Sequence, residues 1–213
     1  MPAKMRVTYS LGDTIEMGLD EAGRGCFWGP LFAGAVIWPP EDCWTDEHRE
    51  IVPLINDSKK MSEKKRHYVA GAIRELAVDW GVGSVQPSEI DEKGITWANR
   101  EAFRRAKDAC STGLEPELLL IDGVLGLPDD VPYECIPGGD GLFVPIAAAS
   151  ILAKTGRDTW VTGWCTQTDA NKEISARYDL LSNKGYGTAK HREGLKNFGY
   201  HSMHRELFIR NWI

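Results

Sequence analysis

The sequence of 213 residues has few cysteines, few histidines and no long hydrophobic run. No apolar stretch approaches the ~20 residues of a membrane helix, so we expect no membrane association. The five cysteines are odd in number and never form a Cys-x-x-Cys pair, which argues against a zinc site and a secreted disulfide framework. Residues 1–12 lack the apolar core of a signal peptide. We therefore expect a cytoplasmic protein in a reducing compartment.

An excess of positive charge is also missing, because the formal net charge is −6. That value by itself does not suggest a protein that binds nucleic acid. The average hides an asymmetry, since residues 1–153 carry 15 Lys and Arg against 25 Asp and Glu, whereas residues 154–213 carry 10 against 6. An acidic part that holds cations beside a basic part that holds phosphates fits a nuclease, although chance unevenness would give the same counts.

The order of the predicted elements indicates the fold class. At 213 residues, with 42% hydrophobic content, the chain suits one globular domain or one domain with a small appendage. Strand patterns precede helical patterns in the first 150 residues, and only helical patterns follow. This order predicts an α/β sheet domain with a C-terminal helical appendage.

Hydrophobic periodicity places the individual elements. Strand patterns cover residues 13–19, 31–38, 78–85 and 118–123, and helical patterns cover residues 62–77, 89–109, 145–164, 171–181 and 188–198. In the first of these helices we expect Ser62 to be the N-cap and Tyr68 to point inward. Residues 41–56 are expected to form an irregular surface connection, and residues 128–134 a loop.

One stretch organises the rest of the chain, Asp20-Glu21-Ala22-Gly23-Arg24-Gly25. Neighbouring side chains of a strand point to opposite faces, so the chain should leave strand geometry here if both acids share one site. The glycines permit such a change of direction. Carboxylate oxygens suit Mg²⁺ or Mn²⁺, and an arginine beside free amides suits a phosphate or a sugar hydroxyl. A surface turn with two solvated acids is an equal alternative.

Two further acids, Asp122 and Asp140, are candidates for the same site. Asp122 ends an otherwise apolar strand, and burying it without a partner is costly, so it is the best companion for Asp20 and Glu21. Asp140 lies in a glycine-rich bend just before a helix. Lys59 and Lys60 follow in a separate polar loop, and they are either ordinary surface charge or phosphate contacts.

Five segments together resemble one enzyme family, the type 2 ribonucleases H, and most of all bacterial ribonuclease HII. They are Asp20–Gly25, Asp57–Lys60, Ile121–Gly123, Ala147–Asp158 and Asn183–Gly187, and the similarity runs from about residue 15 to 208. The resemblance implies a ribonuclease H-like fold, in which a mixed five-stranded sheet is flanked by helices. It implies a catalytic domain over residues 1–165 and a C-terminal helical part over residues 166–213 that contributes to substrate binding.

The resemblance also implies an activity. Such enzymes cleave the RNA strand of RNA–DNA hybrids, and they cut 5′ of a single ribonucleotide embedded in duplex DNA. The products carry 3′-hydroxyl and 5′-phosphate ends. The implied partners are therefore RNA–DNA hybrid and DNA that contains ribonucleotides, and the implied cofactor is Mg²⁺ or Mn²⁺.

Residue roles follow from the matching motifs. Asp20, Glu21, Asp122 and Asp140 match the four metal-site acids, with Asp20 bridging two ions, Glu21 and Asp122 completing one and Asp140 the other. Gly23, Arg24 and Gly25 match the loop that reads the ribose 2′-hydroxyl, and Tyr186 matches the tyrosine that senses the junction with the next deoxyribonucleotide. Lys59, Lys60 and Lys184 lie in segments similar to phosphate-contacting segments.

The sequence departs from the family pattern in three places. Gly138-Gly139 precede Asp140 where a basic residue is usual, and Cys26-Phe27-Trp28 is bulkier than is common. The end of the chain, residues 208–213, lacks a glutamine-led aromatic tail of the kind that binds sliding clamps. We expect a monomer without such a clamp motif.

Other interpretations remain open from the sequence. A different nuclease or strand-transferase on the same sheet is disfavoured by the Gly-Arg-Gly loop and Tyr186. A non-catalytic module that binds RNA–DNA hybrid is disfavoured by the presence of all four acids. We expect Asp158 to have a structural role, paired elsewhere, and the three histidines after residue 153 to be ordinary surface residues.

Overall fold

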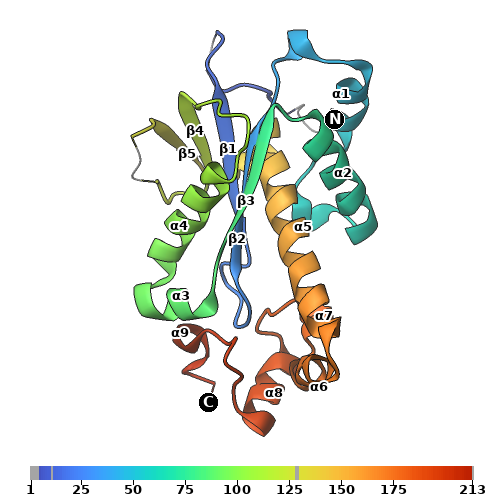
Figure 1. The fold of residues 1–213 in the computed structure, drawn as a ribbon, viewed down its shortest axis with the longest axis vertical. Helices are drawn as coiled ribbons and strands as arrows, with labels where there is room; N and C mark the ends of the chain where they lie inside the picture. Colours follow the sequence, from blue (N-terminus) through green and yellow to red (C-terminus); the bar gives the residue numbers. More distant parts are fainter. Residues whose placement is uncertain (1–4, 11, 128–129, 213) are drawn as a thin grey trace.

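The computed structural model describes residues 5–10, 12–127 and 130–212, and it contains a mixed five-stranded sheet covered by helices on both faces (Figure 1). The strand order is β3-β2-β1-β4-β5. The strands are β1 (Glu16–Ala22), β2 (Leu31–Ile37), β3 (Asp79–Val85), β4 (Leu118–Asp122) and β5 (Tyr133–Ile136). The first three pair antiparallel, whereas β4 and β5 run parallel to β1. The predicted fold class is confirmed.

The helices are α1 (Asp46–Ile51), α2 (Glu63–Leu76), α3 (Pro87–Lys93), α4 (Ile95–Asp108), α5 (Val144–Gln167), α6 (Asp169–Tyr178), α7 (Leu180–Asn183), α8 (Ala189–Phe198) and α9 (Glu206–Ile209). The long helix α5 covers one face of the sheet, and α3 and α4 lie on the other (Figure 1). Helices α1 and α2 lie on the α5 side, and α6, α7 and α8 gather at the C-terminal end of α5, whereas α9 lies beside α3. None of these helices is long and apolar enough to cross a membrane.

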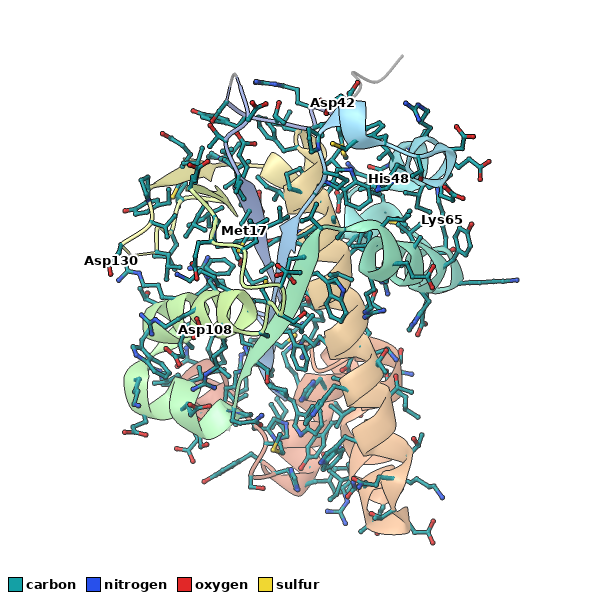
Figure 2. All side chains as sticks on the ribbon, turned by 45° about the horizontal axis from the view of Figure 1, so that its top comes forward. Met17, Asp42, His48, Lys65, Asp108 and Asp130 are labelled. Carbon is teal, nitrogen blue, oxygen red and sulfur yellow. The ribbon has the colours of Figure 1, made fainter. Side chains whose placement is uncertain are left out.

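Alternation along β1 divides its side chains between the two faces of the sheet. Met17 and Leu19 are buried in the core formed with α4, and Figure 2 shows Met17 in the interior while Lys65 points outward from α2. Gly18 lies against the first turn of α5. Asp20 is two residues beyond Gly18 and therefore lies on the same face of the sheet. Its carboxylate is directed to the α5 side.

Helix α5 approaches the sheet closely because two strand residues have no side chain. A Cβ built on Gly34 of β2 would overlap the carbonyl oxygen of Ala149, and one on Gly18 would overlap the backbone of Pro145. Both obstacles are backbone atoms of a buried helix, so neither has room to move. Small residues on both sides thus set the distance between α5 and the sheet, as the alanine-rich sequence of this helix indicates.

We expect Gly34→Ala to lower the free energy of unfolding by about 3 kcal/mol, because the added methyl must push α5 from the sheet. Gly71→Ala in α2 is the matched control, since nothing lies within 4 Å of its Cβ position, and it should stabilise the fold by about 0.5–1 kcal/mol. Urea unfolding of both variants measures the difference. Equal stability of the two variants would contradict the close-packing argument.

The helix predictions are correct in outline and wrong in detail. Ser62 caps α2 as expected, because its hydroxyl accepts a hydrogen bond from the Lys65 amide. Tyr68 was expected to point inward, but its side chain is 65% exposed. The single helix expected over residues 89–109 is two helices, because Gly94 adopts a positive φ of 83° between α3 and α4.

Several local predictions are corrected by the structure. Residues 41–56, expected to be irregular, contain α1, whose N-terminus is capped by Thr45 and His48. In the expected loop over residues 128–134, Tyr133 and Glu134 begin β5, while residues 128 and 129 lie outside the described residues. The chain does not leave strand geometry at Asp20, because β1 stays paired with β2 as far as Ala22.

The C-terminal helices pack around the end of α5 through a separate hydrophobic core that includes Trp28, Tyr178 and Leu195. Phe27 and Trp28 account for the bulk after the glycine loop, since Trp28 is fully buried against Trp164. The expectation of surface histidines is wrong here: His191 and His204 are buried within this core region. Burial is possible because the two rings hydrogen-bond each other, with 3.0 Å between their Nε2 atoms.

Burial of these rings makes the fold acid-sensitive. Burial lowers the pKa of His191 to about 4 and that of His204 to about 3, the latter with help from neighbouring His191. The folded-state pKa values lie below the unfolded value of about 6.5, so the unfolded chain binds protons first and stability is lost as pH falls from about 6.5 towards 4. We expect the melting temperature to fall less between pH 7.5 and pH 5 in His204→Gln than in the unmodified chain. An equal fall would contradict the prediction.

Candidate active site

Three carboxylates converge where the central strands end. Asp20 on β1, Asp122 at the end of β4 and Asp140 on the 3₁₀ turn Gly139–Gly141 each offer an oxygen within 4.8 Å of the others. The parallel register pairs Leu19 with Ile121, so the two acids that follow these residues are neighbours on one face of the sheet. Three of the four acids expected from the sequence are therefore brought together.

Glycine before the third acid has a local reason. The amide of Gly139 donates a 2.7 Å hydrogen bond to Asp122 Oδ1, which ties the turn to the end of β4. A Cβ at Gly139 would come within 2.6 Å of the Ile146 methyl on α5. The departure from the family pattern thus lets the turn lie against α5 and deliver Asp140 to the cluster.

The charges in this cluster are poorly compensated. Burial raises the pKa of Asp20 well above its usual value, and the nearby Glu21 and Asp122 carboxylates raise it further. The pKa of Asp140 is also raised, first by burial and then by Asp122. Ser150 of α5 opposes the effect at Asp20 by hydrogen bonding to it. Carboxylates that are both buried and crowded are stabilised by a bound cation.

Glu21 lies outside this group of three. Glu21 is the residue next to Asp20 along β1, so its side chain leaves the strand on the opposite face. Its carboxylate lies 3.9 Å from Arg24 Nη1. Burial raises its pKa, while Arg24 lowers it. Asn99 of α4, which the sequence did not single out, also lowers that pKa by hydrogen bonding. In this structure Glu21 therefore faces the neighbouring cleft rather than the centre of the acidic cluster.

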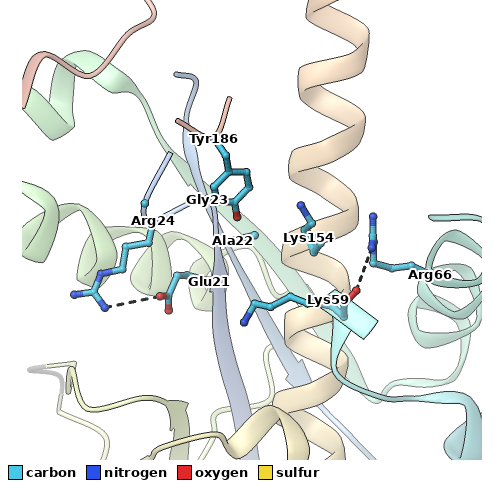
Figure 3. A pocket seen from close by; sticks show the side chains of 10 residues that line it. Glu21, Ala22, Gly23, Arg24, Lys59, Arg66, Lys154 and Tyr186 are labelled. Atoms are coloured by element: carbon cyan, nitrogen blue, oxygen red, sulfur yellow. Dashed lines mark hydrogen bonds and ion pairs between the residues drawn. The ribbon is translucent and has the colours of Figure 1, made fainter. Parts of the chain in front are cut away.

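A cleft of about 600 Å³ opens beside the acids (Figure 3). Its lining residues are Glu21, Ala22, Gly23, Arg24, Gly25, Ser58, Lys59, Arg66, Lys154 and Tyr186. Ser58 connects the cleft to the acidic cluster, because its hydroxyl lies 3.0 Å from that of Ser150. The glycine loop and Tyr186, which are 161 positions or more apart in the chain, thus meet in one cavity with several cations.

Two buried arginines, Arg157 and Arg205, contact the glycine loop and hold it in place. Arg205 Nη1 donates to the carbonyls of Gly23 and Arg24 at 2.8 and 2.9 Å. Arg157 occupies the space that a Cβ on Gly23 would need, and Gly23 itself has a φ of 83°. Both restrictions require glycine at this position. The sequence contained no signal for either support, since each arginine lies more than 130 residues from the loop.

The lysines expected to contact phosphate have different surroundings. Lys59 lines the cleft, as Figure 3 shows. Lys60 is mostly exposed and lies 3.3 Å from the Asp57 carboxylate. Lys184 Nζ donates to Thr162 Oγ1 at 2.8 Å, and Lys184 is not among the residues that line the cleft. The structure thus brings only the first of the three into the cavity.

Two other cations of the cleft were missed by sequence reasoning, Arg66 and Lys154. Both pair with Asp158, at 3.0 and 2.9 Å. These ion pairs confirm the structural role expected for that aspartate. The spacing of Lys154 and Asp158, four residues apart on α5, was the available signal for this pair.

Tyr186 closes one side of the cleft, and its side chain remains 39% exposed. Lys154 Nζ lies 5.5 Å and the Arg157 guanidinium 5.7 Å from the centre of its ring. Burial raises the pKa of the Tyr186 hydroxyl to about 12, so the phenol keeps its proton at neutral pH. The ring thus offers a flat surface and a hydrogen-bond donor to the cleft.

A mixed sheet that gathers carboxylates at its strand ends, beside a cleft lined by lysine and arginine, defines a metal-dependent nuclease: acids suit divalent cations and the cleft suits a phosphate backbone. The family model for Ribonuclease HII matches residues 17–211. The chain belongs to the ribonuclease HII family, and its substrates as a ribonuclease H are RNA–DNA hybrids.

A similar protein supports the family, and solved structures support the fold. Ribonuclease HII of Parabacteroides distasonis is 42% identical over 205 residues, which cover 96% of this chain and 94% of that protein. The crystal structure of ribonuclease H2 from Pyrococcus horikoshii OT3 has a TM-score of 0.69 at 22% identity and covers 92% of this chain and 96% of that one. The PCNA:RNase HII complex from Archaeoglobus fulgidus has a TM-score of 0.64 at 24% identity, covering 93% and 96%. Bst-RNase HIII in complex with Mn²⁺ has a TM-score of 0.60 at 20% identity, covering 93% and 65%.

Affinity for substrate should fall steeply with salt in spite of the net negative charge, because cations line the cleft. We expect Lys59→Gln to weaken binding of an RNA–DNA hybrid and to reduce the slope of log K against log salt by about one. Lys65→Gln is the control, since this lysine of α2 is exposed and is not among the residues that line the cleft. Fluorescence anisotropy at several salt concentrations measures the slopes. A flat plot for the unmodified chain would refute the prediction.

Proposed function

We propose that this enzyme, besides cleaving RNA–DNA hybrids, cuts duplex DNA 5′ of a single embedded ribonucleotide and leaves 3′-hydroxyl and 5′-phosphate ends. The observation that carries this proposal is the meeting of the Gly23-Arg24-Gly25 loop with Tyr186 in one cleft beside the acidic cluster. A single ribonucleotide in DNA is marked locally by its 2′-hydroxyl alone. The enzyme therefore needs close polar groups on one side of that sugar and a surface that selects deoxyribose on the other.

The residues present fit two divalent cations, Mg²⁺ or Mn²⁺. Asp20, Asp122 and Asp140 supply hard oxygen donors at short mutual distances, and burial leaves their charge in need of compensation. Glu21, from its place at the cleft, would join these three aspartates in holding the ions. When bound, such a pair of ions activates the attacking water and stabilises the leaving oxygen.

The other residues of the cleft bind and orient the substrate. The loop at Gly23–Gly25 lacks side chains at two of three positions, so its backbone can approach a sugar hydroxyl closely. Its carbonyls at Gly23 and Arg24 are occupied by Arg205. Lys59 and Lys154 place positive charge along the cleft, where a phosphate backbone would run.

We propose that the enzyme acts as a monomer in the cytoplasm. Residues 166–212 contribute to substrate binding by carrying Tyr186 to the cleft.

Cleavage of labelled oligonucleotides tests the proposed function. The substrates are a DNA duplex with one ribonucleotide, a continuous RNA–DNA hybrid and an all-DNA duplex, each with Mg²⁺, with Mn²⁺ and with chelator. We expect metal-dependent cleavage of the first two and none of the third, with the cut in the first 5′ of the ribonucleotide. An enzyme that cuts the hybrid but leaves the embedded ribonucleotide intact would refute the proposal.

A further inference from the structure

We propose that His191 and His204, two buried residues outside the cleft, are positioning residues that hold Tyr186 in place through one hydrogen-bond relay. The proposal rests on the function proposed above for Tyr186 as the residue that senses the junction. It extends that function to groups that touch neither substrate nor metal. The two histidines reach Tyr186 only through its backbone carbonyl.

The relay connects four groups in succession: the Tyr186 carbonyl, the His191 ring, the His204 ring and the His201 amide. His191 Nδ1 lies 3.0 Å from the carbonyl oxygen of Tyr186, and its Nε2 lies 3.0 Å from His204 Nε2. The other nitrogen of His204 lies 2.9 Å from the backbone amide of His201. The relay therefore begins at the loop before α9 and ends at the residue that closes the cleft.

With both rings neutral, the Tyr186 carbonyl decides the arrangement of protons. A carbonyl only accepts, so His191 must carry its proton on Nδ1 and accept on Nε2. His204 must then donate from Nε2, so its Nδ1 accepts from the His201 amide and does not donate to the His201 carbonyl oxygen, which lies 3.1 Å away. Both imidazoles are neutral in this arrangement, and each bond has one donor and one acceptor.

The surroundings favour the neutral form of both rings. His191 is fully buried and His204 is 2% exposed. The rings pack against Tyr178 and Phe27, and the charged groups that act on the cluster are Asp179 on His191 and Arg177 on His201. Burial lowers the pKa of each buried ring to about 4 or below, so neither is protonated at neutral pH.

The same short segment also holds the glycine loop. Arg205 follows His204 directly and donates to the carbonyls of Gly23 and Arg24. The segment His201–Arg205 thus contacts both substrate-reading elements, the glycine loop through a guanidinium and the Tyr186 loop through the two histidines. It joins two elements that also meet directly, because the Phe27 amide donates to the Gly185 carbonyl at 2.9 Å.

Histidine ring ¹⁵N and ¹H NMR of the intact protein tests the relay without any activity measurement. We expect His191 to show the Nδ1–H tautomer and His204 the Nε2–H tautomer, with both patterns unchanged from pH 8 to pH 6. Observation of an imidazolium, or of the opposite tautomer on either ring at neutral pH, would overturn the proposed relay.

Cleavage by His191 variants tests whether the relay positions Tyr186. His191→Leu removes the donor, whereas His191→Asn keeps an amide donor close to the Nδ1 position. Loss of a buried hydrogen bond of this kind corresponds to about a tenfold change. We expect His191→Leu to lose about tenfold in cleavage at a single ribonucleotide and far less on continuous hybrid, and His191→Asn to recover most of that loss.

The outcomes separate the two proposals. If the unmodified enzyme fails to cut at a single ribonucleotide, the proposed function is wrong, and the tautomers alone then decide the relay. If the unmodified enzyme cuts but both variants lose both activities equally, in step with their melting temperatures, the histidines only stabilise the core. If neither variant loses single-ribonucleotide cleavage, the positioning role is likewise overturned.

Discussion

Asp20→Asn and Asp122→Asn should each abolish cleavage while leaving the fold intact. Both carboxylates belong to the group whose oxygens lie within 4.8 Å of one another, and amide substitution removes the charge that a divalent cation needs. Changing a residue that only orients a metal ligand costs about 10–100-fold, so losing a ligand should cost more than about a hundredfold. Initial rates on an RNA–DNA hybrid with Mg²⁺ measure the loss. Asp46→Asn, at a fully exposed site on α1, is the matched control and should cleave normally.

The substitution Asp20→Asn should change stability in the opposite direction when metal is absent. The folded-state pKa of Asp20 is raised, so at pH above the unfolded value of about 3.9 its ionised form destabilises the fold. An asparagine side chain at this position carries no charge, and its carbonyl oxygen can still accept the Glu21 amide bond that Asp20 Oδ1 accepts at 2.7 Å.

We therefore expect Asp20→Asn to melt at a higher temperature than the unmodified chain at pH 8 with chelator, and to gain less from added Mg²⁺ or Mn²⁺. The advantage should shrink as the pH falls and the unmodified carboxyl takes up its proton. Near-normal turnover in either aspartate variant at equal purity, or a lower melting temperature for Asp20→Asn without metal, would contradict the metal-site assignment.

Tyr186→Ala should lose most cleavage at single ribonucleotides and less on continuous hybrid. The Tyr186 ring lines the cleft together with the glycine loop, and stacking on an aromatic side chain is worth about 1–3 kcal/mol per nucleotide, which is about 5- to 150-fold. The phenol stays protonated because burial raises its pKa, and its hydroxyl lies within hydrogen-bonding reach of the Cys26 thiol. Tyr186→Phe keeps the ring and loses this donor, and its activity should fall between the two.

Melting temperatures distinguish this role from simple packing. Tyr186 is 39% exposed and its neighbours are the cations of the cleft, so truncation should cost little stability. The ratio of the two cleavage rates is the quantity to compare among the unmodified enzyme, Tyr186→Phe and Tyr186→Ala. If Tyr186→Ala lowers both rates together and in step with a lower melting temperature, the residue is structural.

The sequence alone was enough to predict the class of fold and most of the acids in the acidic cluster. Local patterns sufficed for four strands and for the start of α2 but not for β5, because a buried strand ending in Asp122 and an N-cap at Ser62 depend on neighbours along the chain. The motifs, taken in order, were enough for the family, which the match over residues 17–211 confirms. Local patterns failed where one residue overrode a periodicity, as when Gly94 divided a predicted helix in two.

Only the tertiary structure decided how the parts of the cleft face one another. The parallel register of β1 and β4 put Asp20 beside Asp122, and no local pattern contains that register. The supports Arg157 and Arg205 lie 127 and 182 residues along the chain from the Pro30 and Gly23 carbonyls to which they donate. Their burial looked improbable from composition, because a polar side chain enters a core only when its partners are in place. Those partners are backbone carbonyls, which every residue carries, so the sequence bears no mark of them.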